Sequence, residues 1–164
     1  MAEGRPRRPF HGLMLRLPKA IVVPERAGDD KLASGVLRAD GSYAALSQAW
    51  IRARKPIPAP SLSPGEKVQD SRGRYLFGGH FRGHFGHFLV ESTARLWALD
   101  HIKTPLDGIL YMPYRGQVAP IEAAMKGHAP FFQALGIDLP LKTFGGPVRV
   151  DELILPELGF GWED

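Results

Sequence analysis

The order of apolar runs in the second half of the chain limits the folds that it can adopt. Short apolar runs that end at Gly or Pro alternate there with two longer segments that contain few or no Gly and Pro residues. The runs at 74–77, 107–112 and 148–155 predict strands, and the segments at 87–100 and 119–135 predict helices. Strand, helix, strand, helix, strand is the order of a parallel sheet with helical crossovers. We therefore predict an α/β fold.

The first 65 residues predict an appendage to this sheet. A β-branched run, an Asp-Gly pair between apolar flanks and four closely spaced prolines predict a strand, a β-hairpin and a stiff linker, at 20–23, 36–44 and 55–65. A glycine loop follows the last predicted strand where the next helix is expected, so the lobe is expected to be incomplete at its C-terminus. The expected parts are a basic irregular arm, the appendage with its linker, and a Rossmann-like lobe, at 1–18, 19–65 and 66–164.

Composition and charge exclude several classes of protein. The 164 residues contain no cysteine, which excludes disulfide scaffolds, thiolate metal sites and cysteine nucleophiles. The net charge of +4 comes from the first 26 residues, and the remainder is neutral, so no nucleic-acid groove is expected. No apolar run reaches the roughly 18 residues of a membrane span. Because His11, Arg16 and Lys19 interrupt every candidate signal-peptide core, we expect a cytoplasmic protein.

The stretch between the first predicted strand and the first predicted helix carries the candidate chemistry. It reads GGHFRGHFGHFLVESTARLW from Gly78 to Trp97 and holds three of the six histidines. On the predicted helix, His87, Glu91 and Arg95 are spaced four and four and share one face. The other faces are mostly apolar, which predicts a buried helix. Its polar stripe must then open onto a cleft or be paired internally, since an unpaired buried charge is costly.

A functional and a structural interpretation of this stripe are both open on the residues alone. In the first, Glu91 is a general base or grips sugar hydroxyls, and His87 orients it or shares a proton. Arg95 then keeps Glu91 ionised or holds a phosphate. In the second, Glu91 and Arg95 form an i,i+4 pair that fixes the helix in place.

Two further interpretations use the neighbouring residues. His80, His84 and His87 would form a metal site, but their spacing matches no usual zinc signature, and we expect no metal. Gly83 and Gly86 precede the expected helix N-terminus, where free N–H groups attract a phosphate. The chain has neither the GxGxxG pattern nor a Lys-Ser/Thr pair to support that cradle.

The segment HFGHFLVESTARLWAL resembles the hallmark of the family 61 glycosyltransferases, the capsular polysaccharide biosynthesis type in bacteria. The family pattern is roughly Asn-x-x-His-Trp-x-x-Glu-x-x-Pro-Arg-Leu. The chain matches its histidine, glutamate, arginine and leucine with His87, Glu91, Arg95 and Leu96. It departs from the asparagine, tryptophan and proline, where it has His84, Phe88 and Ala94.

This resemblance implies one lobe of a two-lobed GT-B architecture. Such enzymes transfer a sugar, with inversion and without a metal or other cofactor, from a nucleotide donor to a glycan acceptor in surface or capsular polysaccharide synthesis. The N-terminal lobe presents the acceptor face, and the C-terminal lobe, absent here, holds most nucleotide-sugar contacts. On this basis Glu91 and His87 are the expected catalytic residues, and His84, Arg95 and Gly86 contact substrate. The alternative is an inactive fragment or interaction lobe with a purely structural stripe.

Overall fold

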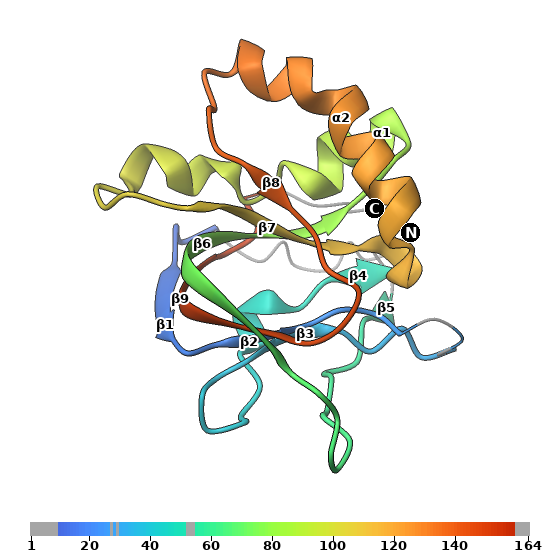
Figure 1. The fold of residues 1–164 in the computed structure, drawn as a ribbon. Coiled ribbons are helices and arrows are strands. Elements are labelled where there is room, and N and C mark those ends of the chain that lie inside the picture. Colours follow the sequence, from blue (N-terminus) through green and yellow to red (C-terminus); the bar gives the residue numbers. More distant parts are fainter. Residues whose placement is uncertain (1–9, 27, 29, 52–54, 160–164) are drawn as a thin grey trace, which may run out of the picture.

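The computed structural model describes residues 10–26, 28, 30–51 and 55–159. Seven strands form the central sheet: β1 (Met14–Pro18), β2 (Ile21–Val23), β3 (Gly35–Leu37), β6 (Gln69–Phe81), β7 (Gly108–Pro113), β8 (Leu141–Lys142) and β9 (Val148–Pro156). Their order is β3-β2-β9-β6-β7-β8, and β1 also pairs with β9 (Figure 1). A separate two-stranded sheet is formed by β4 (Trp50–Ile51) and β5 (Lys55–Pro56).

The four strands β9, β6, β7 and β8 run parallel. Three of them were predicted from the apolar runs, and β8 was not. The chain leaves β6 for β7 and then β8 on one side, and β9 joins β6 on the other side. The strand order therefore reverses between β6 and β9. The whole of β7 and the second halves of β6 and β9 are buried on both faces, which explains the apolar runs at 75–77, 109–113 and 153–156. The molecule is a mixed α/β structure around a mostly parallel sheet.

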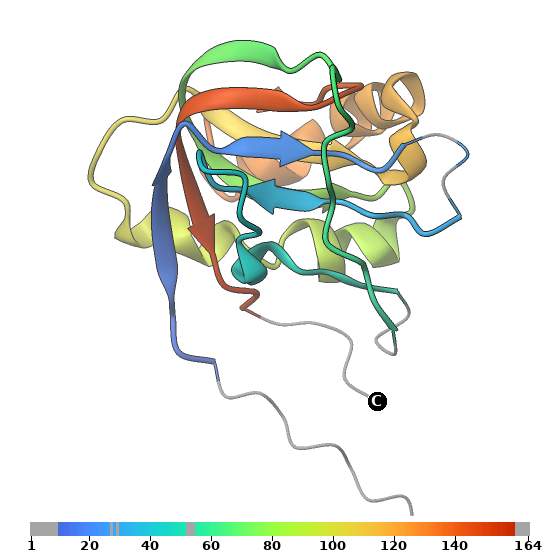
Figure 2. The same cartoon turned by 90° about the horizontal axis from the view of Figure 1, so that it is seen from below.

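The N-terminal strands are part of this sheet rather than an appendage beside it. β1 runs antiparallel to the second half of β9, and β2 to its first two residues (Figure 2). Lys19, with a φ of 52°, makes the bend between β1 and β2. The irregular arm expected up to residue 18 is thus a strand from Met14 onward, because the exposed edge of β9 offers it backbone partners. Residues 1–9 of that arm lie outside the described residues.

The predicted hairpin and linker differ in outcome. A turn does form at the Asp-Gly pair, where Leu37 and Tyr43 make an isolated bridge. The linker at 55–65 is not a free spacer, because Ile57 is buried and the amide of Ser34 donates to the carbonyl of Pro58. The proline-rich segment therefore packs along β3.

The helical elements are short apart from one. They are η1 (Ala45–Ser47), α1 (Phe85–His87), a π-helical turn η2 (Phe88–Ser92), η3 (Leu96–His101), η4 (Tyr114–Gly116) and α2 (Val118–Ala134). The segments at 85–101 and α2 lie together on one side of β6 and β7 (Figure 1). The sheet is curled, so that side chains of β1, β2 and β3 pack against the opposite face of β6, β7 and β9. Among the described helices, none has the length and apolar character that a membrane crossing requires.

The prediction of one continuous helix at 87–100 is wrong. The carbonyl of Ser92 accepts the Tyr111 hydroxyl, and the amide of Leu96 bonds to Thr93 instead, which begins a 3₁₀ turn. The hydroxyl of Thr93 also bonds back to the carbonyl of Leu89, which competes with a regular helical ladder. The second predicted helix is confirmed as α2, and Gly136 follows it with a φ of 71°, as expected for a residue past a helix C-terminus.

Gly78 is required by close packing, and Gly127 offers a matched comparison. A Cβ at Gly78 would overlap the ring of Tyr111, whereas a Cβ at Gly127, in α2, meets no atom within 4 Å. Gly78→Ala is expected to lower the free energy of unfolding by about 3 kcal/mol, the upper part of the range for an overpacked core. Gly127→Ala is expected to raise it by about 0.5–1 kcal/mol, because alanine favours the helix. Urea unfolding of both variants measures this difference, and equal effects would contradict it.

Candidate functional site

The polar side chains of the candidate site gather where β6 ends. His80 and Arg82 are two residues apart at the end of this strand, so both point to the same side, and Phe81 between them is buried in the core. The end of β7 lies beside them, since His80 pairs in register with Met112. This is the carboxyl edge of the parallel strands, next to the point where the strand order reverses. Open α/β sheets bind their ligands at such points.

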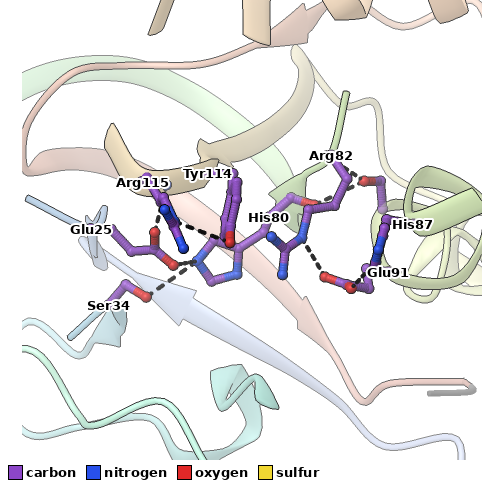
Figure 3. A network of polar contacts seen from close by, with 9 residues as sticks. Glu25, Ser34, His80, Arg82, His87, Glu91, Tyr114 and Arg115 are labelled. Carbon is purple, nitrogen blue, oxygen red and sulfur yellow. Dashed lines mark hydrogen bonds and ion pairs between the residues drawn. The ribbon is translucent and has the colours of Figure 1, made fainter. Parts of the chain in front are cut away.

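Glu91 is the centre of the first group of contacts. Its Oε2 accepts a hydrogen bond from Arg82 Nε at 2.5 Å, and its Oε1 lies 3.0 Å from His87 Nδ1 (Figure 3). The Glu91 side chain is 22% exposed and that of His87 53%, so solvent reaches this pair. The structure therefore brings together the two residues predicted to be catalytic. It adds an arginine that holds the carboxylate from the other side.

A second group lies deeper and joins the first through β6. Glu25 Oε1 is 3.0 Å from His80 Nε2, and both side chains are buried. Ser34 Oγ lies 3.3 Å from the same nitrogen. This ring nitrogen therefore has two oxygen atoms, of Glu25 and Ser34, within hydrogen-bonding distance. The other oxygen of Glu25 accepts the backbone amide of Arg115 at 2.5 Å, which fixes the turn after β7.

The hydroxyl of Ser92 fastens the π-helical turn to the end of β6. It donates to the carbonyl of His80 at 3.0 Å and accepts the amide of Arg82 at 2.9 Å. The Ser92 carbonyl in turn accepts the hydroxyl of Tyr111, whose pKa burial raises, so that this group remains a donor. These bonds set Glu91, one residue before Ser92, beside Arg82.

Arg95 does not join the predicted stripe. Its guanidinium donates to the backbone carbonyls of Pro156 and of Leu46, the latter at 3.1 Å, and the residue is 1% exposed. Burial lowers the pKa of Arg95 to about 10, so the group is still charged at neutral pH. Because the π-helical turn has i→i+5 geometry and the ladder then breaks, Arg95 is no longer below Glu91. Arg82 occupies the place beside Glu91 that was expected for Arg95.

The remaining predicted residues lie on the rim of the site. His84 is exposed immediately before α1, and its ring centroid is 5.6 Å from that of His87. Gly86 is exposed in α1, next to the His84 ring. The expected phosphate cradle at Gly83 and Gly86 has little support, because α1 spans only three residues and its dipole is correspondingly small.

The three histidines considered as metal ligands do not converge. The imidazole of His80 is buried against Glu25, while His84 and His87 are exposed on the other side of Arg82. Within the described part of the chain, no group of three or more His, Cys, Asp or Glu side chains has the geometry to hold a metal ion.

Reasoning from the sequence missed the residues that come from distant segments. Glu25 lies 55 residues before His80, and no local pattern marks it. Tyr114 and Arg115 follow β7, and their proximity to β6 depends on the sheet register. Arg82 carried the one usable signal, since strand alternation places it on the same side as His80.

A surface pocket with a volume of about 290 Å³ lies at the other end of the sheet, away from these groups. It is lined by Lys19, Asp70, Ser71, Arg72, Arg149, Val150 and Asp151, at the start of β6 and along β9. Its charged groups are largely paired with one another, as in the 2.5 Å contact between Lys19 Nζ and Asp151 Oδ1. The Lys19 bond and the amide of Gly73 hold the pKa of Asp151 below its usual value.

Comparison of the chain with protein-family models, with curated proteins and with solved structures gives no match.

The buried guanidinium predicts a large effect of substitution. Arg95→Met is expected to lower the free energy of unfolding by about 2–4 kcal/mol, because two desolvated carbonyls lose a charged donor. Arg16→Met is the matched control. Arg16 is exposed and forms a surface ion pair with Glu152 at 3.7 Å, and such a pair contributes within about 1 kcal/mol to stability. Denaturant unfolding compares the two variants. An Arg95→Met protein as stable as the Arg16→Met protein would show that the buried bonds contribute nothing.

Proposed function

We propose that this chain is the N-terminal, acceptor-side lobe of an inverting glycosyltransferase of the family 61 type, which acts in surface or capsular polysaccharide synthesis. The observation that carries the proposal is the position of Glu91. Its carboxylate lies 3.0 Å from His87, is open to solvent, and stands at the carboxyl edge of the parallel strands. The residues that match the family's histidine and glutamate are thus paired at the edge where such sheets bind ligands.

The strand order supports the same proposal. Counted from β6, the parallel strands follow the order 3-2-1-4, which is the order of a Rossmann-like half-sheet. A GT-B enzyme has one such sheet in each lobe. This chain departs from the usual pattern in two respects. Helices cover one face of its sheet, and the loop at 143–147, rather than a helix, connects β8 to β9.

Inverting transfer needs a base close to the acceptor hydroxyl. The hydroxyl oxygen forms a bond to the anomeric carbon of the donor while the bond from that carbon to the nucleoside diphosphate breaks, and the hydroxyl proton passes to the base. Glu91 fits this part because Arg82 holds one oxygen and His87 the other. The imidazole of His87 then accepts or shares the proton. In this proposal the C-terminal lobe binds the nucleotide sugar and balances the charge of the leaving group.

The position of Arg95 favours a second candidate, a lobe without catalytic activity. The arginine of the motif-like segment bonds here to backbone carbonyls and is sealed from solvent. By the same logic, the pair of Arg82 and Glu91 would only fasten the π-helical turn to β6. Such a lobe would serve as an interaction or regulatory unit.

Replacement of Glu91 by glutamine separates the two candidates. The sample is the protein as its gene encodes it, together with a second lobe if one is encoded separately. In this sample, Glu91→Gln is expected to lower kcat at least about 100-fold. Its melting temperature is expected to stay close to that of the wild type, because glutamine still fills the space. The measurement is nucleoside diphosphate release from a panel of nucleotide sugars with glycan acceptors.

Glu122→Gln, on the exposed side of α2, is the matched control and is expected to retain full activity. Wild-type turnover by Glu91→Gln would remove this carboxylate from the mechanism. A Glu91→Gln protein that does not fold would instead favour the structural candidate.

A further inference from the structure

Two guanidinium groups share one aromatic ring at the edge of the candidate site. The Cζ atom of Arg82 is 3.7 Å from the centre of the Tyr114 ring, and that of Arg115 is 5.3 Å from it. The two arginines follow the neighbouring strands β6 and β7, and Figure 3 shows Tyr114 between them. The negative face of the ring attracts each cation, but the cations repel one another. An anion bound at the edge of the ring, close to both cations, would offset that repulsion.

The side-chain hydrogen bonds that both arginines make to described residues use Nε rather than the outer amino groups. Arg82 donates from Nε to Glu91, and Arg115 donates from Nε to the hydroxyl of Tyr114. Over the described ranges, neither residue makes a hydrogen bond through Nη1 or Nη2. The Arg82 side chain is only 14% exposed, so bulk water has limited access to its free donors. A guanidinium presents such amino groups as a planar fork that fits a carboxylate or a phosphate.

The backbone of Arg115 has a conformation that is uncommon for a residue with a side chain. Its φ is 54°, in the left-handed region, which costs a non-glycine residue about 1–2 kcal/mol. Glu25, which is buried and also holds His80, bonds to the Arg115 amide and so maintains this conformation. Glycine would adopt it without strain. Strained residues that are held by the surrounding structure concentrate at functional sites.

We propose that Arg82 and Arg115 bind an oxyanion, a carboxylate or phosphate group, on the acceptor glycan. Glu91 binds Arg82 through Nε, and Glu25 binds the backbone amide of Arg115, so neither carboxylate forms a hydrogen bond to the outer amino groups that the anion would use. Because one edge of the Arg82 guanidinium binds Glu91, an anion on its other edge lies within about one sugar unit of the proposed base. The assignment of the anion to the acceptor rests on the proposed function; the binding of the anion does not.

The test is a titration of the ¹⁵N-labelled chain followed by NMR. The probes are methyl β-D-glucuronide, inorganic phosphate and, as a neutral comparison, methyl β-D-glucoside. We expect the glucuronide, phosphate or both to bind with a millimolar Kd and to shift the Nε–H signals of Arg82 and Arg115, and the glucoside to leave them unmoved. Binding of the glucuronide alone assigns the site to a uronic acid, and binding of phosphate alone assigns it to a phosphorylated glycan.

Arg115→Gln tests the site without disturbing its frame, because the backbone amide that bonds to Glu25 is retained. Its affinity for the anion is expected to fall at least about tenfold, the loss of one charged hydrogen-bonded contact. Arg72→Gln removes an exposed arginine at the other end of β6 and is expected to bind as the wild type does. Unchanged amide dispersion in both variants confirms that they fold.

Three results would overturn the proposal: no shift with either anion at tens of millimolar, equal binding of the glucoside, or unchanged affinity in Arg115→Gln. None of them depends on transfer. Anion binding by a protein without transferase activity would refute the proposed function and leave this site standing. Transfer to acceptors by a protein that binds no anion would support the proposed function and refute the anion site.

Discussion

The buried guanidinium of Arg95 connects three segments that are far apart in the sequence. It lies in the turn before η3 and donates to the carbonyls of Leu46, in η1, and of Pro156, at the end of β9. The last register pair of β6 and β9 is Leu76 with Ile154, after which the two strands separate. Arg95 fills the space that opens there, next to Gly79, whose φ of 84° favours glycine. The carboxyl edge of the sheet depends on this residue.

The same arrangement explains the form of the candidate site. With Arg95 turned inward, the segment after α1 cannot remain a regular helix, and its polar groups bond to the sheet instead. Ser92 bonds to the end of β6 through its hydroxyl and to Tyr111 through its carbonyl. Glu91 is thereby directed to Arg82, a partner on the strand, rather than to the arginine four residues later. The site is built from the junction of a strand and a π-helical turn.

Sequence patterns could predict the parts of this structure that depend on local order. The strands β7 and β9 and the helix α2 were predictable because apolar runs next to Gly and Pro residues set their approximate limits. Only the centre of β6 was predicted, since this strand continues through Gly78 and Gly79 to Phe81. The pairing of His87 with Glu91 was also predictable, since residues four apart remain neighbours in a single turn. The rest depended on distant partners. The helix at 87–100 fails because of Tyr111, Arg95 is placed by Leu46 and Pro156, and Glu25 reaches His80 only through the folded sheet.

The short outer strands of the sheet affect how this molecule can associate with other chains. On one side the sheet ends with β8, which has two residues, and on the other with β3, which has three and continues into a turn. The five residues of β1 form a third edge, beside the second half of β9. Edges as short as β3 and β8 offer few free backbone donors and acceptors to a strand of a neighbouring molecule. Extension of the sheet from chain to chain is therefore disfavoured at β3 and β8. Association with a second domain at these two edges would have to use side-chain surfaces rather than strand pairing.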